Sequence, residues 1–382
     1  MEALFWISTF VFAYAYFIYP LIIHRLAKRK VSLSNDIKVE SEEHPVSVVL
    51  CVYNGESSIK ARLNNLFASK YPSNKINLIV VSDGSTDNTS NIVKDYQEQE
   101  KFGHQVTFVD LPKNAGKASA LNSAYPFIKT DYVAFCDIRQ TFCENALREM
   151  MNEFTEPSVG AVTGNLIIRN DEDNLESDPG LYWKYEKWIR DNEGKVRSLV
   201  GVTGAIYMAR TELLPQILPS DAILDDMFVP LNIVKAGYNV KMANKAYAYD
   251  ISSATIKEEF DRKVRTLAGN FQLMNLLPFV NSFRNPLLIQ WWSHKVARLL
   301  VPYSLVGIAA SSLMLEGLFY ELVTYGQIVF YGYSALAYLA IKADRKLPLG
   351  NVLVNFITLN YAAFLAGWRY YTSSAQELWK KH

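Results

Sequence analysis

VSVVLCVYN (residues 46–54) and INLIVVSD (residues 76–83) decide the fold. Each is a short, almost wholly apolar run that ends in polar residues, which predicts a strand buried on both faces of a sheet. Further predicted strands lie at 105–111, 131–137 and 159–168, and predicted helices at about 57–69, 85–99 and 116–127. Because strands and helices alternate, the sequence predicts an α/β fold with a mostly parallel sheet.

The composition of the whole chain excludes two classes of protein. Of its 382 residues, 39 are Lys or Arg and 38 are Asp or Glu, so the net charge is +1. A dedicated nucleic-acid-binding protein usually carries a basic excess, and we expect no nucleic-acid partner. With 20% charged and 13% aromatic residues, the chain is not disordered over most of its length. Mean hydropathy is zero, which is high for a soluble protein and indicates that apolar segments accompany polar ones.

The apolar segments lie at the two ends of the chain. Residues 3–23 contain no Asp, Glu, Lys or Arg, long enough for a helix to cross a membrane, and three more such stretches follow at 299–315, 322–341 and 347–368. The mixed aromatic and basic stretch 284–298 is typical of an interfacial helix. The predicted organisation is an N-terminal anchor with a basic flank (1–30), a linker (31–44), a central α/β domain (45–270), interfacial helices (271–298), about three transmembrane helices (299–370) and a polar tail (371–382).

The basic cluster after the first apolar segment predicts the orientation. Because His24, Arg25 and 28–30 follow the segment, the positive-inside rule predicts that the N-terminus lies outside and the central domain in the cytoplasm. Three later spans would place Arg369 outside, against the same rule. Either the rule fails at this end, or one of the later segments is interfacial.

Polar clusters end three of the predicted strands. Tyr53 and Glu56 follow the first, Asp83 ends the second, and Asp137 ends the fourth. Ligands of such sheets bind at the carboxyl ends of the strands, so these side chains are expected to line one site. Neither a GxGxxG nor a GxxxxGK[ST] motif is present, which argues against a dinucleotide site and a P-loop.

Each of these residues also has an ordinary structural explanation. Asp83 could accept the imide N–H of a pyrimidine base or simply cap a turn. Lys117 could neutralise a diphosphate near a helix start or be an exposed loop lysine. An Asp-x-Asp pair would hold Mg²⁺ or Mn²⁺, but the residue after Asp137-Ile138 is Arg139, which could contact phosphate or pair with Asp137.

Three further groups allow two interpretations each. Asp225 and Asp226 precede a helical stretch, where one could be an N-cap and the other a base with raised proton affinity. Arg262 and Arg265, one helical turn apart, could clamp pyrophosphate or contact lipid headgroups. The aromatic stretch LYWKYEKWIR (181–190) could stack on sugar rings or pack in a core.

Taken in order, seven stretches resemble the family 2 glycosyltransferases with the GT-A fold, in the membrane-bound branch with cellulose, hyaluronan and poly-N-acetylglucosamine synthases. They are VSVVLCVYNGE, VVSDGSTDNT, KNAGKASALN, AFCDIRQ, GVTGAIYMAR, ILDDMFVPLNIVKAGY and RKVRTLAGN. The resemblance spans roughly residues 46–270 and implies a Rossmann-like GT-A catalytic domain flanked by transmembrane helices.

The resemblance implies a role for each matching position. It implies nucleotide-sugar contacts from Tyr53, Glu56, Asp83, Lys117, Asp137, Arg139, Arg262 and Arg265. Asp137 would bind the metal, Mg²⁺ or Mn²⁺, and Asp226 would be the catalytic base beside Asp225. Gly204 and Ala205 match the loop beside the acceptor, where we also expect the aromatic residues Trp183 and Tyr185.

Two departures from the family pattern bear on function. Arg139 replaces the second metal-binding carboxylate, and Thr266 stands where processive synthases have a Trp beside the acceptor. The main hypothesis is an inverting transferase that moves a sugar, most simply from a UDP-sugar, to a glycan or lipid-linked acceptor in polysaccharide synthesis. Alternatives are a single addition to a lipid-linked oligosaccharide, and a degenerate nucleotide-sugar-binding subunit of a polysaccharide assembly. The implied surroundings are membrane lipids of a bacterial inner or plasma membrane and possible partner subunits of such an assembly.

Overall fold

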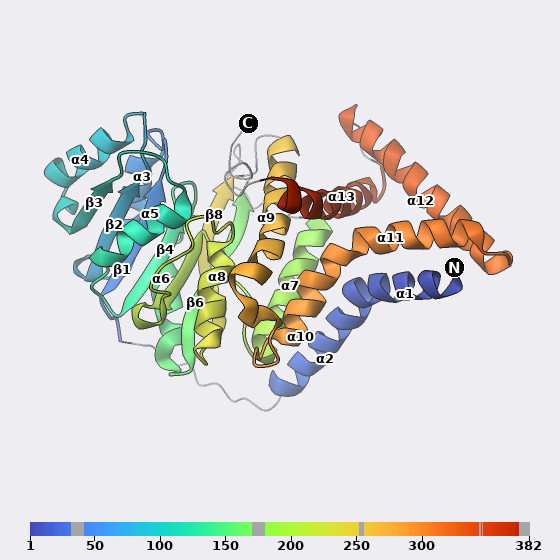
Figure 1. Ribbon diagram of the computed structural model, residues 1–382. Coiled ribbons are helices and arrows are strands. Elements are labelled where there is room, and N and C mark those ends of the chain that lie inside the picture. Colours follow the sequence, from blue (N-terminus) through green and yellow to red (C-terminus); the bar gives the residue numbers. More distant parts are fainter. Residues whose placement is uncertain (32–41, 170–179, 252–255, 344, 346, 374–382) are drawn as a thin grey trace.

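The computed structural model describes residues 1–31, 42–169, 180–251, 256–343, 345 and 347–373. Most of the predicted linker (31–44) and of the polar tail (371–382) lies outside these residues. The chain forms an α/β domain joined to an arm of long helices that carries the N-terminus (Figure 1).

The domain is built on one eight-stranded sheet with the strand order β3-β2-β1-β4-β7-β6-β8-β5. Strands β3, β2, β1 and β4 run parallel, β7 is antiparallel to both of its neighbours, and β8 is parallel to β6. The strands are β1 Val46–Val52, β2 Ile76–Ser82, β3 Val106–Asp110, β4 Tyr132–Asp137, β5 Thr141–Phe142, β6 Val159–Arg169, β7 Ile206–Arg210 and β8 Asn239–Ile251. The five predicted strands and the mostly parallel sheet are confirmed.

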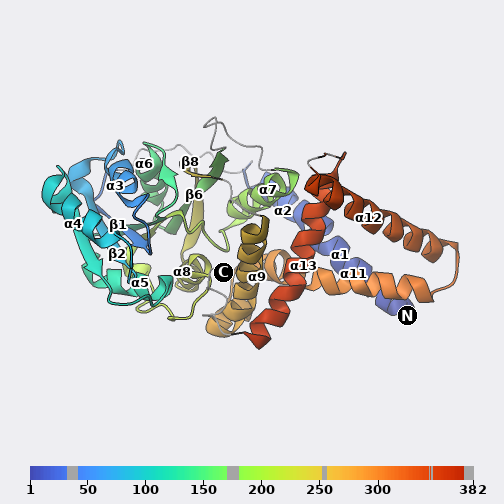
Figure 2. The same ribbon diagram turned by 90° about the horizontal axis from the view of Figure 1, so that it is seen from above.

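Helices cover both faces of this sheet, and Figure 2 shows the two layers. Alternate residues of β1 point into different cores: Val48 packs with α3, α4 and α6, whereas Val49 packs with α5 and α8. A strand buried on both faces must be apolar throughout, which is why 46–52 has no polar alternation. The covering helices are α3 Ile59–Phe67, α4 Thr89–Gln99, α5 Lys117–Ala124, α6 Ala146–Asn152 and α8 Asp225–Lys235.

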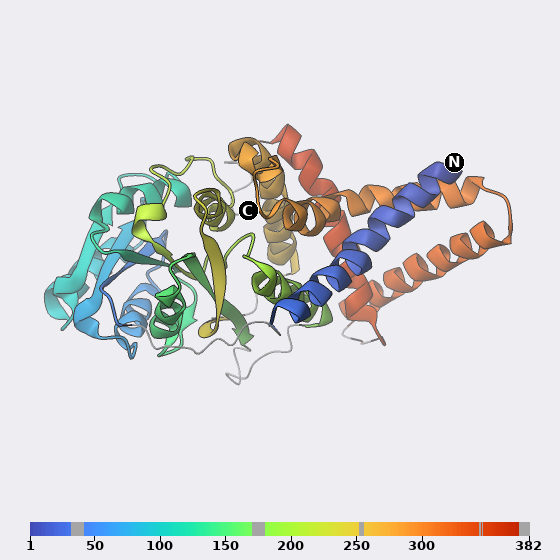
Figure 3. The ribbon, with the colours of Figure 1, turned by 90° about the horizontal axis from the view of Figure 1, so that it is seen from below.

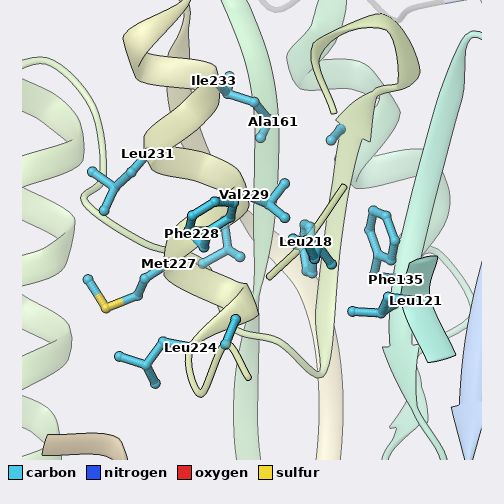
Figure 4. Packing of buried hydrophobic residues seen from close by; sticks show 14 of the residues in the cluster. Leu121, Phe135, Ala161, Leu218, Leu224, Met227, Phe228, Val229, Leu231 and Ile233 are labelled. Atoms are coloured by element: carbon cyan, nitrogen blue, oxygen red, sulfur yellow. The ribbon is translucent and has the colours of Figure 1, made fainter. Parts of the chain in front are cut away.

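Buried apolar side chains of helix α8 hold it against the sheet. Phe228, Leu231 and Ile233 are fully or nearly buried in the core beneath the sheet, together with Leu218 and Phe135 (Figure 4). Burial of a side chain of this size stabilises a fold by about 1.5–3 kcal/mol. The first turn of α8, which carries Asp225 and Asp226, is therefore held firmly against the sheet edge.

The remaining long helices form the arm and its junction with the domain. They are α1 Glu2–Ala13, α2 Tyr19–Val31, α7 Gly180–Val196, α9 Ile256–Leu276, α10 Leu288–Gln290, α11 Ala297–Met314, α12 Leu318–Lys342 and α13 Gly350–Thr372. The N-terminal helix lies beside α11, α12 runs back from the end of α11, and α13 crosses beside α9 (Figures 1 and 3).

Among the residues that the structure describes, three helices are long and apolar enough to cross a membrane: Glu2–Lys30, Leu288–Met314 and Gly350–Thr372. The predicted span at 322–341 is also helical, as part of α12, but does not reach the same hydropathy. The expected separate helix at 284–298 differs from the structure, because residues from Leu288 onward continue directly into α11 through a π-helical turn. The partly buried ion pair of Arg298 with Glu186 of α7 lets this basic stretch pack instead of lying free at an interface.

Candidate active site

Three strand ends with polar residues meet at one edge of the sheet. In the register of the parallel strands, Val52 is opposite Ser82 and Cys51 is opposite Asp137. The residues that follow β1 and β2 therefore lie level with the end of β4. The predicted convergence of these segments is confirmed by the strand register.

Asp83 is buried, at 5% exposure, and holds the loop that leads into α5. Its Oδ1 accepts the backbone N–H of Ala115 at 2.8 Å, and its Oδ2 accepts that of Gly116 at 2.9 Å. Asp83 therefore caps backbone N–H groups, as in its structural interpretation, but those of the loop before α5 and not those of its own turn. The same contacts position Lys117, the first residue of α5.

Gly84 allows the loops after β2 and β3 to pack closely. Its φ is +65°, and a Cβ atom there would lie 2.2 Å from the carbonyl carbon of Lys113. A side chain at this position would push apart the two loops that Asp83 joins.

Tyr53 and Glu56 form the outer part of this edge. Tyr53 is half exposed. The carboxylate of Glu56 accepts the N–H of Asn88 at 3.0 Å, while its own N–H donates to Asp87 at 3.0 Å. The loops after β1 and β2 are thereby tied together.

Lys117 lies at the centre of a cluster of carboxylates. Its Nζ is 3.0 Å from Asp137 Oδ1 and 3.4 Å from Asp225 Oδ2. A Cβ atom on Gly204 would lie 3.3 Å from Cβ of Asp226 and 3.6 Å from Lys117 Nζ, so both side chains face this glycine. Burial alone would lower the pKa of Lys117, but attraction to Asp137 and Asp225 raises it well above its usual value. The lysine is therefore a permanent cation.

Asp225 and Asp226 occupy the first turn of α8 itself. The helix begins at Asp225, after Leu224, and no side chain caps it, so the N-cap interpretation does not hold. Burial, followed by repulsion from Asp225, raises the pKa of Asp226 to about 6, although Lys117 opposes the shift. A carboxylate with such a pKa can accept a proton near neutral pH.

Arg139 points away from this cluster. Its guanidinium pairs with Asp250 of β8 at 2.7 Å, and Gln140 donates to the same carboxylate at 2.9 Å. Of the two interpretations of Arg139, pairing with Asp137 is not what the structure shows, because β8 lies next to β5 and brings Asp250 to the segment after β4.

The carboxyl edge of the sheet offers few side-chain ligands for a divalent metal ion. Among the residues described, no three His, Cys, Asp or Glu side chains are grouped to hold a metal ion. Asp137 offers one carboxylate, which fits an ion held mainly by a diphosphate and water, as is common for Mg²⁺. Lys117 supplies a fixed positive charge at the same place.

Arg262 and Arg265 both lie on α9. Arg262 pairs with Glu259 and is partly exposed. Burial and the nearby Arg262 lower the pKa of Arg265, while Asp226 and Asp225 raise it. Arg265 thus lies within electrostatic range of the carboxylate cluster, and Arg262 lines the same cavity as Asp226.

A cavity of about 700 Å³ opens beside Asp226. Its walls come from the loop before β7, the first turn of α8, helices α7, α9 and α13, and the π-helical turn Trp291–Val296 that precedes α11. Lining residues from these elements include Thr203, Asp226, Tyr182, Trp183, Arg190, Arg262, Thr266, Lys295, Asn355 and Leu359.

The four predicted acceptor residues differ in their position relative to the cavity. Trp183 lines it, and Gly204 lies next to Asp226, with Ala205 buried behind it. Tyr185 instead faces the N-terminal helix, where its hydroxyl donates to the carbonyl of Tyr16 at 2.5 Å. Arg190 and Lys295 were not singled out from the sequence, because no motif marks them and their chain segments meet only in the folded protein.

The chain matches two family models and several known proteins. The model described as glycosyl transferase family 2 matches residues 47–215, and that described as glycosyl transferase family group 2 matches residues 140–343. A poly-beta-1,6-N-acetyl-D-glucosamine synthase of Staphylococcus epidermidis is 27% identical over 271 residues, 69% of this chain and 64% of that protein. One from Staphylococcus aureus is 28% identical over 243 residues, 63% of this chain and 57% of its own.

A solved structure shares the fold across the chain. It is a mannosyltransferase from Pyrobaculum calidifontis in complex with GDP-Man and Mn²⁺, with a TM-score of 0.74 and 20% identity. The superposition covers 99% of this chain and all of that one. The shared architecture therefore includes the helices at both ends as well as the sheet.

Proposed function

The chain belongs to glycosyl transferase family group 2, and we propose that it is an inverting membrane glycosyltransferase that uses a nucleotide-sugar, most simply a UDP-sugar. The proposal rests on the cluster of Lys117, Asp137 and Asp226. This cluster lies between the carboxyl ends of the strands, where we expect the nucleotide to bind, and the cavity. A diphosphate can lie on one side of the cluster and an acceptor on the other.

The nucleotide-sugar donor would bind at the carboxyl ends of the strands. The nucleoside lies along Tyr53, Glu56 and Asp83, and the diphosphate lies at Lys117. Mg²⁺ or Mn²⁺, held by Asp137 and the diphosphate, would supply further charge to stabilise the leaving group. Lys117 stabilises the same developing charge without a metal ion.

The acceptor side follows from Asp226. An acceptor hydroxyl in the cavity loses its proton to Asp226 as its oxygen attacks the anomeric carbon. The bond between that carbon and the diphosphate breaks on the opposite face, so the configuration inverts. Asp225 repels the charge on Asp226 and thereby raises its proton affinity.

The rate is expected to depend on pH through Asp226. A base must be unprotonated, and its pKa is about 6 in the structure. Activity should therefore be lost as the pH falls through 6 and should reach a plateau above about 7. Initial rates measured between pH 5 and 8 test this, with circular dichroism at each pH to confirm that the protein stays folded. A rate that is unchanged from pH 7 to pH 5 would contradict the assignment.

The membrane placement rests on the helical arm. The helices Glu2–Lys30 and Leu288–Met314 lie side by side and are apolar enough to cross a bilayer. By the positive-inside rule, the basic residues at the end of the first helix favour a catalytic domain in the cytoplasm of a bacterial cell. If α13, which packs along α9, lies at the membrane surface, Arg369 also stays on the cytoplasmic side.

Two candidate functions, polymer synthesis and a single sugar addition, differ in their acceptor. The names of the Staphylococcus relatives favour the synthesis of a β-linked amino-sugar polymer. Thr266 favours a single addition, because it lines the cavity and offers no aromatic face on which a sugar ring could stack. Both functions use the same donor site and the same base.

Product analysis separates these functions. Membranes containing the full chain are incubated with radiolabelled UDP-N-acetylglucosamine, UDP-glucose or GDP-mannose, and the products are resolved by size. A polymer synthase yields a ladder, whereas a single-addition enzyme yields one labelled species. Absence of any labelled product with every donor, despite donor binding, would favour the degenerate binding subunit.

A further inference from the structure

A short segment, residues 221–224, leads into the helical turn that carries Asp226, and helix α9 holds this segment. Gln272 of α9 is buried, at 7% exposure. Its Oε1 accepts the backbone N–H of Ile223 at 2.9 Å, and its Nε2 donates to the backbone carbonyl of Asp221 at 2.8 Å. One side chain thus supplies partners for an N–H and a carbonyl of the segment that no regular element pairs.

Gly269 allows α9 to approach the same segment closely. It lies one helical turn before Gln272. A Cβ atom at Gly269 would lie 2.5 Å from Cγ of Leu224 and 3.1 Å from Cγ2 of Ile223. Any side chain at this position would therefore push Leu224 away from α9.

Leu224 in turn sets the first turn of α8. Its carbonyl accepts the N–H groups of Met227 at 3.2 Å and of Phe228 at 2.9 Å. Asp226 lies within this turn, and its own carbonyl accepts the N–H of Val202 at 2.9 Å. A shift of Leu224 would therefore move the side chain of Asp226 relative to its surroundings.

The face of α9 that meets this segment also forms a wall of the cavity. Thr266 and Gly269 follow Arg262 at four and seven positions, a spacing that places all three on one face of a helix. Arg262 and Thr266 line the cavity. A single helix face therefore contacts both the cavity and the segment that leads to Asp226.

Helix α13 fixes the opposite face of α9. Figures 1 and 2 show α9 between α8 and α13. Val264 and Ala268 of α9 are fully buried in a cluster with Ala362 and Ala366 of α13. Because such a packed contact resists even small displacements, α9 is a rigid support for the segment.

We propose that Gln272 and Gly269 are positioning residues that set the distance between Asp226 and an acceptor held against the α9 wall. The inference rests on the proposed function and deepens it. Neither of these two residues lines the cavity, so both act through Asp226 and not by touching the substrate. A general base must lie within hydrogen-bonding distance of the hydroxyl it deprotonates, and a misplacement of about 1 Å can cost about a hundredfold in rate.

The variants Gln272→Ala and Gly269→Ala test the inference by separating turnover from donor binding. Each should lower kcat by about tenfold to a hundredfold, while the dissociation constant of the nucleotide-sugar changes by less than about twofold. Initial rates at saturating donor and acceptor are paired with equilibrium donor binding by the full chain in detergent micelles, and intact binding shows that a variant is folded. Normal kcat in both variants would overturn the inference.

Asn122→Ala is the matched control. The side chain of Asn122 accepts the N–H of Leu218 at 2.8 Å and donates to the carbonyl of the same residue at 2.8 Å. The substitution thus removes the same pair of hydrogen bonds from the chain ahead of α8, but before the segment that Gln272 holds. We expect its urea midpoint to fall about as far as that of Gln272→Ala, with near-normal kcat. An equal fall in kcat would show a general effect of loosening this chain region and would overturn the positioning role.

Combination with Asp226→Asn shows whether Gln272 acts through the base. When Gln272→Ala is added to Asp226→Asn, the residual turnover should fall by less than about twofold, because the base that Gln272 positions is already absent. A purely structural role predicts that the two losses multiply, and that result would overturn the inference.

Hydrogen exchange tests the contact without activity and keeps the outcomes separable. Amides of residues 221–228 should exchange about tenfold faster in Gln272→Ala than in the wild-type protein, and at the wild-type rate in Asn122→Ala. Unchanged exchange in Gln272→Ala would overturn the inference. If the wild-type protein transfers no sugar from any donor, the proposed function fails. If it does so and Asp226→Asn does not, while Gln272→Ala keeps normal kcat, only the positioning role fails.

Discussion

Replacing Asp226 with Asn is expected to lower the turnover rate by about a thousandfold or more, with little change in donor affinity. The amide has the shape of the carboxylate but cannot accept a proton, and general base catalysis contributes roughly 10²–10⁴ to a rate. Donor binding should persist because Lys117 and Asp137 keep their contact at 3.0 Å. Removing one of the three carboxylates near Lys117 should not unfold the protein, since the lysine keeps the other two.

The measurement pairs initial rates with equilibrium binding of the nucleotide-sugar. Asp95→Asn is the matched control, because Asp95 is an exposed residue of α4, on a helix that contributes nothing to the cavity. That variant should have wild-type activity. Near-normal turnover by Asp226→Asn would refute its role as the base.

Replacing Lys117 with Met is expected to lower both donor use and stability. The diphosphate loses its fixed counter-charge, and we expect a loss of about a hundredfold or more in kcat/KM. Removing one member of a buried ion pair costs about 3–5 kcal/mol. Because a quarter of the Lys117 side chain is exposed, we expect the lower end of that range.

The same variant should also change the pH profile. Lys117 lowers the pKa of Asp226, so its removal should raise that pKa and move the acid limb of the activity to higher pH. Urea unfolding and a pH–rate profile measure the two effects. Lys113→Met, an exposed residue of the same loop, is the control and should change neither. Equal effects of the two substitutions would show that loop charge in general, and not the Lys117 contact, is responsible.

The sequence predicted the first half of the fold because its strands are apolar on both faces. Strands β1, β2 and β4 could be recognised from such runs alone. Strand β8 was not predicted, because lysines interrupt Asn239–Ile251, and β5 has only two residues. The continuation of residues 288–298 into a long helix depends on the pairing of Arg298 with Glu186, which lies 112 positions away in the sequence.

The donor side of the site could be predicted for the same physical reason. Residues at the ends of parallel neighbouring strands must meet, so Asp83 and Asp137 could be placed from their positions alone. The acceptor side could not, because α7, α9 and α13 are brought together only by tertiary packing. The contact of Arg139 could not be predicted from its place in a motif, because its partner Asp250 belongs to a strand that was not predicted from the sequence.

The most direct test of the account is the release of nucleoside diphosphate by the full chain in a lipid bilayer. A panel of UDP- and GDP-sugars is assayed with and without Mn²⁺, for the wild-type protein and for Asp226→Asn. The account predicts that at least one donor is consumed by the wild-type protein in the presence of acceptor and not by the variant, although both bind it. Release at equal rates by both proteins, or by neither with any donor, would contradict it.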